Sequence, residues 1–173
     1  GGGFLLYYDA ATKKMHALDG REEAPAAITE NVFLDAAGKP LPFMGRIAGA
    51  KAIGVPGTVA LLEHAQRRFG SKKVSFSESL SRAVVLAESG IRVSPRLNQA
   101  MRINRERLKA QNAGGIPLLR SGEPYAVGEV LLQTELAATL RRLQKAGAPD
   151  FYRGDIAADI IATVRKNAVY PSA

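Results

Sequence analysis

The residues with the clearest chemical potential lie in a short turn that follows an apolar stretch. Arg21 comes directly after Gly20 and is flanked by Asp19, Glu22 and Glu23. A guanidinium presented from such a turn can bind a carboxylate through two parallel hydrogen bonds. The acidic neighbours could instead satisfy Arg21 in a surface ion pair, and local sequence alone favours that alternative because such pairs are common. Arg21 is therefore a candidate anion-binding residue whose role the turn by itself leaves open.

Other catalytic and metal-binding patterns are weak in this sequence. The chain has no Cys, which excludes disulfides, thiol catalysis and Cys-based zinc sites. His16 and His64 lie far apart and in no metal-binding spacing, and there is no Gly-x-Ser-x-Gly nucleophile motif. We therefore expect no metal and no cofactor.

The three glycines at positions 1–3 could suggest a phosphate-binding loop. They precede an apolar run instead of linking a strand to a helix, and no Lys-Ser or Lys-Thr follows at the required spacing. A nucleotide site is therefore disfavoured. The favoured interpretation is structural, with the glycines allowing close backbone approach or strand-edge packing.

The net charge of +8, from 24 Lys and Arg against 16 Asp and Glu, raises the question of an anionic partner. The most basic segment runs from Arg102 to Lys109, but Glu106 interrupts it and no aromatic residues interleave. Such a segment is typical of a solvated helix face, so we expect no nucleic-acid partner. A non-enzymatic basic helical binding module remains an alternative.

No apolar run approaches the roughly 20 residues that a membrane span needs.

The periodicity of apolar residues predicts one hairpin and about five helices. The hairpin pairs residues 4–8 with 15–18, and its first strand should be largely buried. A loop rich in Gly and Pro covers residues 35–57, and a short strand is expected near 127–131. The helices begin near Thr58, Ser77, Ser94, Thr134 and Pro149. Ser77, Ser94 and Thr134 are candidate N-caps, Pro95 is expected at the first helical position of the third helix, and Gly70 and Gly90 should end the first two. The apolar stripes expected to face a core are Leu62, Ala65 and Phe69; Leu80, Ala83, Val84 and Ala87; Leu97, Ala100, Met101 and Leu108; Leu136, Leu140 and Leu143; and Ala157, Ile160, Ile161 and Val164.

These elements predict an α+β fold that is mostly helical with an N-terminal β-hairpin. Two strands do not form a complete sheet core on their own, so we expect the rest of the sheet to lie elsewhere. The chain begins without Met or a leader and stops just after a helical stretch. We therefore expect residues 1–173 to form a single, incomplete domain with both ends cut.

Six separated segments carry more specific information than any of these patterns. They are residues 1–8 (GGGFLLYY), 17–25 (ALDGREEAP), 54–60 (GVPGTVA), 86–94 (LAESGIRVS), 135–140 (ELAATL) and 150–157 (DFYRGDIA). In this order they resemble the N-terminal part of the large subunit of γ-glutamyltransferases, also called γ-glutamyltranspeptidases. The resemblance covers about residues 1–166. The segment after Lys166 departs from the pattern of the family.

The resemblance implies a fold and a chemistry. The family belongs to the N-terminal nucleophile hydrolases, whose fold is a four-layer αββα sandwich, and this chain would be an incomplete portion of it. A precursor cleaves itself, and the new N-terminal Thr of the small subunit attacks the γ-amide of glutathione or another γ-glutamyl compound, with its own α-amine as base. The six Thr of this chain all lie in contexts that resemble the large subunit. We therefore expect no catalytic residue here and no activity from this fragment alone.

The resemblance also assigns candidate site residues and partners. Arg21 corresponds to the arginine that holds the α-carboxylate of the γ-glutamyl group, and Glu22 to the adjacent glutamate, which we expect to support the pocket. The implied partners are γ-glutamyl compounds and the small subunit of the same precursor, and the implied location is periplasmic or secreted. A relative of the cephalosporin acylases, whose substrate lacks the amino-acid head, remains the alternative within the same fold.

Overall fold

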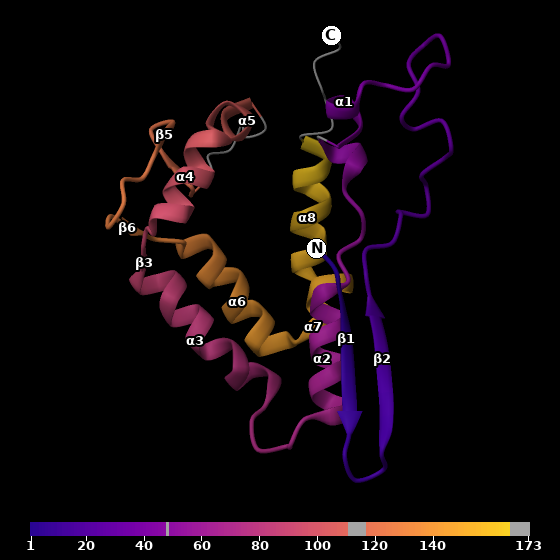
Figure 1. Ribbon diagram of the computed structural model, residues 1–173, viewed down its shortest axis with the longest axis vertical. Coiled ribbons are helices and arrows are strands. Elements are labelled where there is room, and N and C mark those ends of the chain that lie inside the picture. The colour runs from indigo at the N-terminus through magenta and orange to yellow at the C-terminus, as the bar shows by residue number, and fades with distance from the viewer. Residues whose placement is uncertain (48, 111–116, 167–173) are drawn as a thin grey trace. The chain divides into compact units, whose positions relative to one another are not determined.

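The computed structural model describes residues 1–47, 49–110 and 117–166 (Figure 1). The chain divides into two compact units, one made of residues 1–76 and 147–173 and the other of residues 77–146. The first unit contains the hairpin and the second contains a small helical core. The candidate site residues lie in the first unit, which is described first.

The N-terminal hairpin consists of strand β1 (Gly3–Asp9) and strand β2 (Lys14–Gly20). The strands are antiparallel, with Gly3 opposite Gly20 and Asp9 opposite Lys14. The Asp9 carboxylate stabilises the turn because it accepts hydrogen bonds from the Ala11 backbone nitrogen at 2.9 Å and from the Thr12 hydroxyl at 2.7 Å. The predicted hairpin is confirmed, and its open end delivers the chain directly to Arg21.

Within the described residues, only one face of the hairpin is covered. Helix α2 (Thr58–Phe69) packs on that face, where the Tyr7 ring stacks on Phe69 with 4.4 Å between ring centroids. The expectation that the first strand is largely buried is wrong, because successive side chains of a strand point to opposite faces and a single helix covers one of them. The exposed face carries the large apolar side chains Phe4, Leu6, Tyr8 and Met15.

The long connection between the hairpin and α2 contains helix α1 (Phe43–Ile47) and a single 3-10 turn, η1 (Ala50–Ala52). Helix α2 begins at Thr58 and ends before Gly70, as the sequence predicts. Its buried residue is Leu61, which is 8% exposed, whereas the predicted Leu62 is 51% exposed. The buried stripe therefore contains Leu61 in place of Leu62, together with the half-buried Ala65 and Phe69 that the sequence predicts.

Two further helices complete the first unit. Helix α7 (Ala148–Arg153) packs against α2, and helix α8 (Asp155–Lys166) follows it after Gly154. The sequence predicts a single helix here, but the chain turns at Gly154. The Glu63 carboxylate of α2 accepts a hydrogen bond of 3.1 Å from the Ala148 backbone nitrogen, so α2 satisfies the N-terminus of α7. The predicted core residue Ile161 is exposed, and Ile156 is buried in its place.

The second unit is built from helices and very short strands. Its elements are helices α3 (Phe76–Ser89), α4 (Pro95–Ile103), α5 (Arg105–Ala110) and α6 (Thr134–Ala146), and strands β3 (Ile91–Arg92), β4 (Leu119–Arg120), β5 (Glu123–Pro124) and β6 (Val130–Leu131). Strand β3 pairs with β6, and β4 pairs with β5. Val93, Met101 and Leu131 form the core between them. Arg141 of α6 binds Glu88 of α3 through two hydrogen bonds of 2.7 and 2.8 Å.

Helix boundaries in the second unit agree with the sequence where a local cap decides them. The Ser94 hydroxyl accepts a hydrogen bond of 3.1 Å from the Leu97 backbone nitrogen, and Pro95 is the first helical residue, as predicted. The helix that was expected to continue to Lys109 is interrupted at Asn104. Ser77 and Thr134 lie inside helices instead of capping them. The predicted core residues Ala83, Ala100 and Leu136 are exposed.

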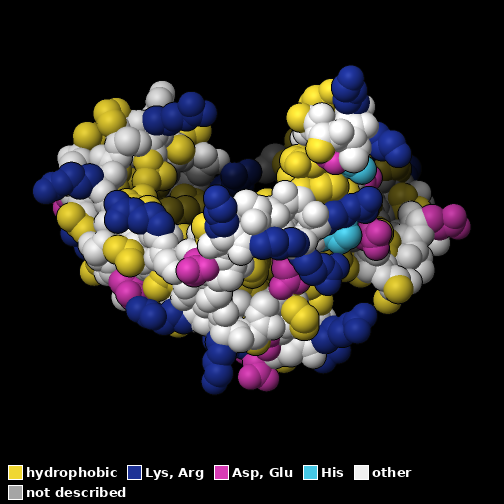
Figure 2. All heavy atoms as spheres, turned by 90° about the horizontal axis from the view of Figure 1, so that it is seen from below, with side chains coloured by type: hydrophobic (Ala, Val, Ile, Leu, Met, Phe, Trp, Pro, Cys, Tyr) yellow, Lys and Arg dark blue, Asp and Glu magenta, His cyan; other side chains and the backbone are white. Residues whose placement is uncertain are grey.

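Charge is dispersed on the surface. On the face seen in Figure 2, Lys and Arg side chains are interspersed with Asp and Glu. In the predicted basic segment, Arg105 forms ion pairs with Glu106 and Glu123, and the Lys109 ammonium lies 3.9 Å from Glu123. Because these basic side chains are paired with carboxylates, the structure does not favour a basic module that binds anionic partners.

No helix in the described part of the chain is both long and apolar enough to span a membrane.

The fold of the described residues is a partial α+β arrangement, with about half of the chain in helices.

The packing of the second unit can be tested directly. Met101 is 1% exposed, so Met101→Ala should lower the free energy of unfolding by about 2–5 kcal/mol, because it removes apolar contacts and leaves a cavity. Chemical denaturation of the purified protein measures this change.

Gln99→Ala is the matched control, because Gln99 lies on the same helix and is exposed. We expect it to change the free energy of unfolding by less than about 0.5 kcal/mol. Equal losses from the two substitutions would contradict the core that we assign to Met101.

Candidate functional site

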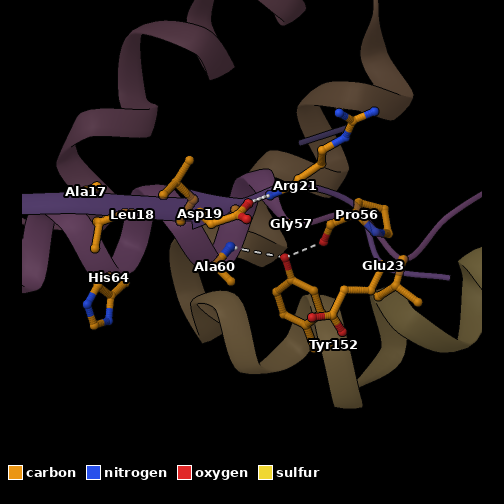
Figure 3. A pocket seen from close by; sticks show the side chains of 13 residues that line it. Ala17, Leu18, Asp19, Arg21, Glu23, Pro56, Gly57, Ala60, His64 and Tyr152 are labelled. Atoms are coloured by element: carbon orange, nitrogen blue, oxygen red, sulfur yellow. Dashed lines mark hydrogen bonds between the residues drawn. The ribbon is translucent and has the colours of Figure 1, made fainter. Parts of the chain in front are cut away.

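Arg21 lies at the point where the chain leaves strand β2. Its backbone nitrogen donates a hydrogen bond of 2.9 Å to the Asp19 carboxylate, which closes a tight turn. The side chain is 71% exposed, and Figure 3 shows it extending away from Asp19 and Tyr152. The turn therefore presents the guanidinium outward, and Asp19 binds the backbone of Arg21, not its charge.

Glu22 lies beside Arg21, so the structure brings the two predicted site residues together. One carboxylate oxygen of Glu22 is 3.8 Å from Nε of Arg21, and the other is 3.3 Å from the Gly1 nitrogen. Its own backbone N–H, the Gly1 amino group and Arg21 lower the pKa of Glu22 below its ordinary value. The contact recorded between the ionised Glu22 and Arg21 is at Nε of the guanidinium.

The backbone of this turn is held by the segment that leads into α2. The Gly57 and Thr58 nitrogens donate hydrogen bonds of 2.9 and 3.2 Å to the Gly1 carbonyl. Glu23 pairs with Val55, whose nitrogen donates to the Glu23 carbonyl at 2.8 Å. The Arg21 turn is thus fixed by backbone contacts on both sides.

Two glycines make this close packing possible. A Cβ atom on Gly57 would lie 2.7 Å from the Arg21 carbonyl oxygen and closer still to that of Gly20. A Cβ on Gly2 would lie 2.7 Å from the Arg21 Cα. Contacts this short do not occur for real Cβ atoms, so only glycine fits at either position. The structural interpretation of the N-terminal glycines therefore holds for Gly2, whereas a Cβ at Gly1 or Gly3 would meet only ordinary contacts at 3.6 and 3.7 Å.

Two cavities meet at Arg21. The first has a volume of about 580 Å³ and the second about 570 Å³. The first is lined by Ala17, Leu18, Asp19, Gly20, Arg21, Glu23, Val55, Pro56, Gly57, Ala60, Leu61, His64 and Tyr152. The second is lined by Gly1, Arg21, Glu22, Glu23, Ala24, Pro25, Ile28, Phe33, Lys51, Ala52, Ile53, Gly54 and Pro56. Arg21 therefore borders space on both sides of the turn, enough for a small anionic ligand.

Tyr152 lies in the wall of the first cavity, and the sequence does not single it out. Its hydroxyl donates to the Pro56 carbonyl at 2.6 Å and accepts from the Ala60 nitrogen at 3.1 Å (Figure 3). Pro56 and Ala60 are 96 and 92 positions away in the sequence, so no local spacing predicts these bonds. The available signal is that Tyr152 belongs to residues 150–157, one of the six segments quoted above.

The two histidines do not come together. His16 packs against Phe69 with 5.0 Å between ring centroids, whereas His64 lines the first cavity. Among the described residues, no group of three or more His, Cys, Asp and Glu side chains is placed to bind a metal ion. What the site offers chemically is an outward-facing guanidinium beside a carboxylate, on a backbone held by hydrogen bonds.

Comparison with known proteins identifies the family. The family model described as gamma-glutamyltranspeptidase matches residues 1–170. This chain belongs to the γ-glutamyltranspeptidase family. Its relatives include the glutathione hydrolase proenzyme of Bacillus subtilis (strain 168), which is 36% identical over 165 residues. That match covers 95% of this chain and 28% of the relative.

Solved structures agree with this assignment. The γ-glutamyltranspeptidase of Helicobacter pylori superimposes with a TM-score of 0.89 at 35% identity, covering 96% of this chain and 47% of that one. The cephalosporin acylase of Bacillus halodurans gives a TM-score of 0.78 at 28% identity, covering 94% and 30%. The chain therefore spans less than a third of the curated relative and about half of the solved γ-glutamyltranspeptidase chain.

The close approach at Gly57 can be tested directly. Gly57→Ala should lower the free energy of unfolding by about 1–3 kcal/mol, because the new methyl group meets backbone oxygens that cannot rotate away. Thermal or chemical denaturation of the purified protein measures the loss.

Gly45→Ala is the control, because a Cβ there meets only the Leu41 side chain at 3.6 Å, an ordinary contact. Ala is also a better helix former than Gly, so this variant should be neutral or slightly stabilising. A Gly57→Ala protein as stable as Gly45→Ala would show that the backbone contact does not constrain the turn.

Proposed function

We propose that this chain supplies substrate recognition to the active site of a γ-glutamyltransferase or glutathione hydrolase. In this proposal Arg21 binds the α-carboxylate of the γ-glutamyl group. The observation that carries the proposal is the exposed Arg21 guanidinium at the border of two cavities, in a chain of this family. A planar guanidinium matches a carboxylate through two parallel hydrogen bonds.

Glu22 has a supporting role in this proposal. It contacts Arg21 at Nε, and we propose that the two outer nitrogens bind the ligand carboxylate. The contact of 3.8 Å at an exposed position is too weak to neutralise the guanidinium, because solvent screens such pairs. Glu22 also lies next to the Gly1 nitrogen, so it joins Arg21 to the start of the hairpin.

The remaining chemistry is assigned to parts of the protein outside this chain. We propose that the precursor cleaves itself to give a small subunit whose N-terminal Thr is the nucleophile. The Thr hydroxyl attacks the γ-amide carbonyl, the amide C–N bond breaks, and the released amine takes a proton. Water or an acceptor amine then opens the resulting ester. On this basis the chain alone is inactive.

The proposal extends to the fold and the location of the protein. The partial α+β arrangement would be completed by the small subunit into an αββα sandwich. The uncovered apolar face of the hairpin supports this, because apolar side chains such as Phe4 and Leu6 gain free energy when they leave water. We further propose that the protein is periplasmic or secreted, as the family resemblance implies.

Acylase activity is the second candidate, favoured by the similarity to the cephalosporin acylase of B. halodurans. The two candidates differ in whether the substrate carries an α-amino-acid head. Hydrolysis of a γ-glutamyl anilide and of a glutaryl anilide by the full-length processed protein separates them. A clear preference for the glutaryl compound would refute the proposed γ-glutamyl specificity.

The role of Arg21 predicts a graded loss of substrate binding. Arg21→Ala should raise KM for a γ-glutamyl anilide by about 10- to 100-fold, the range expected when a hydrogen bond to a charged group is removed. Arg21→Lys should retain part of the affinity, because an ammonium keeps the charge but loses the fork. Steady-state kinetics of the full-length processed enzyme measure both effects.

Arg153→Ala is the matched control, because it removes an exposed positive charge from the same unit at a position that lines neither cavity. Its KM should stay within about twofold of the parent value, since surface charges away from the site contribute little. If Arg21→Ala also leaves KM unchanged, Arg21 does not bind the α-carboxylate.

A further inference from the structure

We propose that Tyr152 is a positioning residue for Arg21. The inference rests on the proposed function, because it concerns how the turn that carries Arg21 is held in place. Tyr152 does not line the cavity with an exposed polar group that is free for a ligand. Its hydroxyl makes two hydrogen bonds within the protein, one as donor and one as acceptor.

Both hydrogen bonds hold the segment that enters helix α2. The Pro56 carbonyl, which accepts from Tyr152 at 2.6 Å, comes just before the helix. The Ala60 nitrogen, which donates at 3.1 Å, belongs to the first turn of α2, where backbone N–H groups have no partner within the helix. A single hydroxyl thus joins the loop to the helix on either side of Gly57.

That same segment is the support for the Arg21 turn. Gly57 packs against the Gly20 and Arg21 carbonyl oxygens, and Val55 pairs with Glu23. A shift of the segment away from Tyr152 therefore moves the surface on which the Arg21 backbone lies. The Tyr152 hydroxyl acts on the guanidinium through this backbone contact and not by touching the substrate.

A second link between the same helices separates positioning from general stability. Glu63 of α2 accepts a hydrogen bond from the Ala148 nitrogen of α7, one turn of α2 beyond Ala60. This hydrogen bond also ties α2 to α7, but neither of its partners belongs to residues 55–60. Removing it weakens the packing of the two helices and leaves the support of Arg21 in place.

The experiment compares Tyr152→Phe with Glu63→Ala in the full-length processed enzyme. Tyr152→Phe keeps the ring and removes only the hydroxyl, so KM for a γ-glutamyl anilide should rise about 3- to 10-fold, in line with the loss of one or two hydrogen bonds. The kcat should change less than about twofold, because the reacting groups are not displaced. Glu63→Ala should lower Tm at least as much and leave KM within about twofold.

A double-mutant cycle tests the route through Arg21. In an Arg21→Ala background, Tyr152→Phe should raise KM no further, because residues that act through one group are not additive. An additive effect, or an equal rise in KM from Glu63→Ala, overturns the positioning role. If Arg21→Ala raises KM and Tyr152→Phe does not, this inference fails and the proposed function stands. If Arg21→Ala has no effect, both fail.

Discussion

The first unit depends on close contact between two backbone segments, residues 20–23 and residues 54–58. The contact brings the Gly57 Cα against the Gly20 and Arg21 carbonyl oxygens, where no side chain has room. The pairing of Glu23 with Val55 stabilises this contact. Hydrogen bonds from the Gly57 and Thr58 nitrogens to the Gly1 carbonyl stabilise it further. Because backbone atoms have few ways to move, a side chain attached to this contact is placed more firmly than one on a free loop. Arg21 is such a side chain.

The same contact explains why a hairpin with one covered face still ends in an ordered turn. Helix α2 covers the inner face of the strands, where Tyr7 stacks on Phe69, and leaves Phe4 and Leu6 exposed on the outer face. Among the described residues of α2, Leu61 is the only one that is buried, so few apolar side chains stabilise this contact. The backbone hydrogen bonds and the two hydrogen bonds of Tyr152 help to fix the orientation of this segment, where few apolar side chains are buried.

Sequence patterns predicted those features of the fold that local chemistry decides. Gly90, with a φ of 83°, and the Ser94 cap mark helix ends because the conformation or the side-chain hydrogen bond belongs to those residues themselves. The buried face was less predictable. Leu61 and Leu62 are adjacent and equally apolar, and only the position of the hairpin decides that Leu61 is buried. The sequence also did not predict that the helices break at Asn104 and Gly154, because these breaks depend on where the chain turns in the fold.

In the candidate site, too, some features could be predicted from local sequence and others depend on the fold. Arg21 and Glu22 are candidates because of their residue types and the segment around them, whereas the hydrogen bonds of Tyr152 span 92 and 96 positions and are visible only in the fold. The placement of Arg21 also bears on substrate class. A guanidinium at the border of a cavity loses part of its hydration when a substrate binds beside it, and a matching anion on the substrate offsets this cost. A substrate without an α-carboxylate leaves that charge unpaired, so in the proposed function the same contact that fixes Arg21 also discriminates against substrates that lack the amino-acid head.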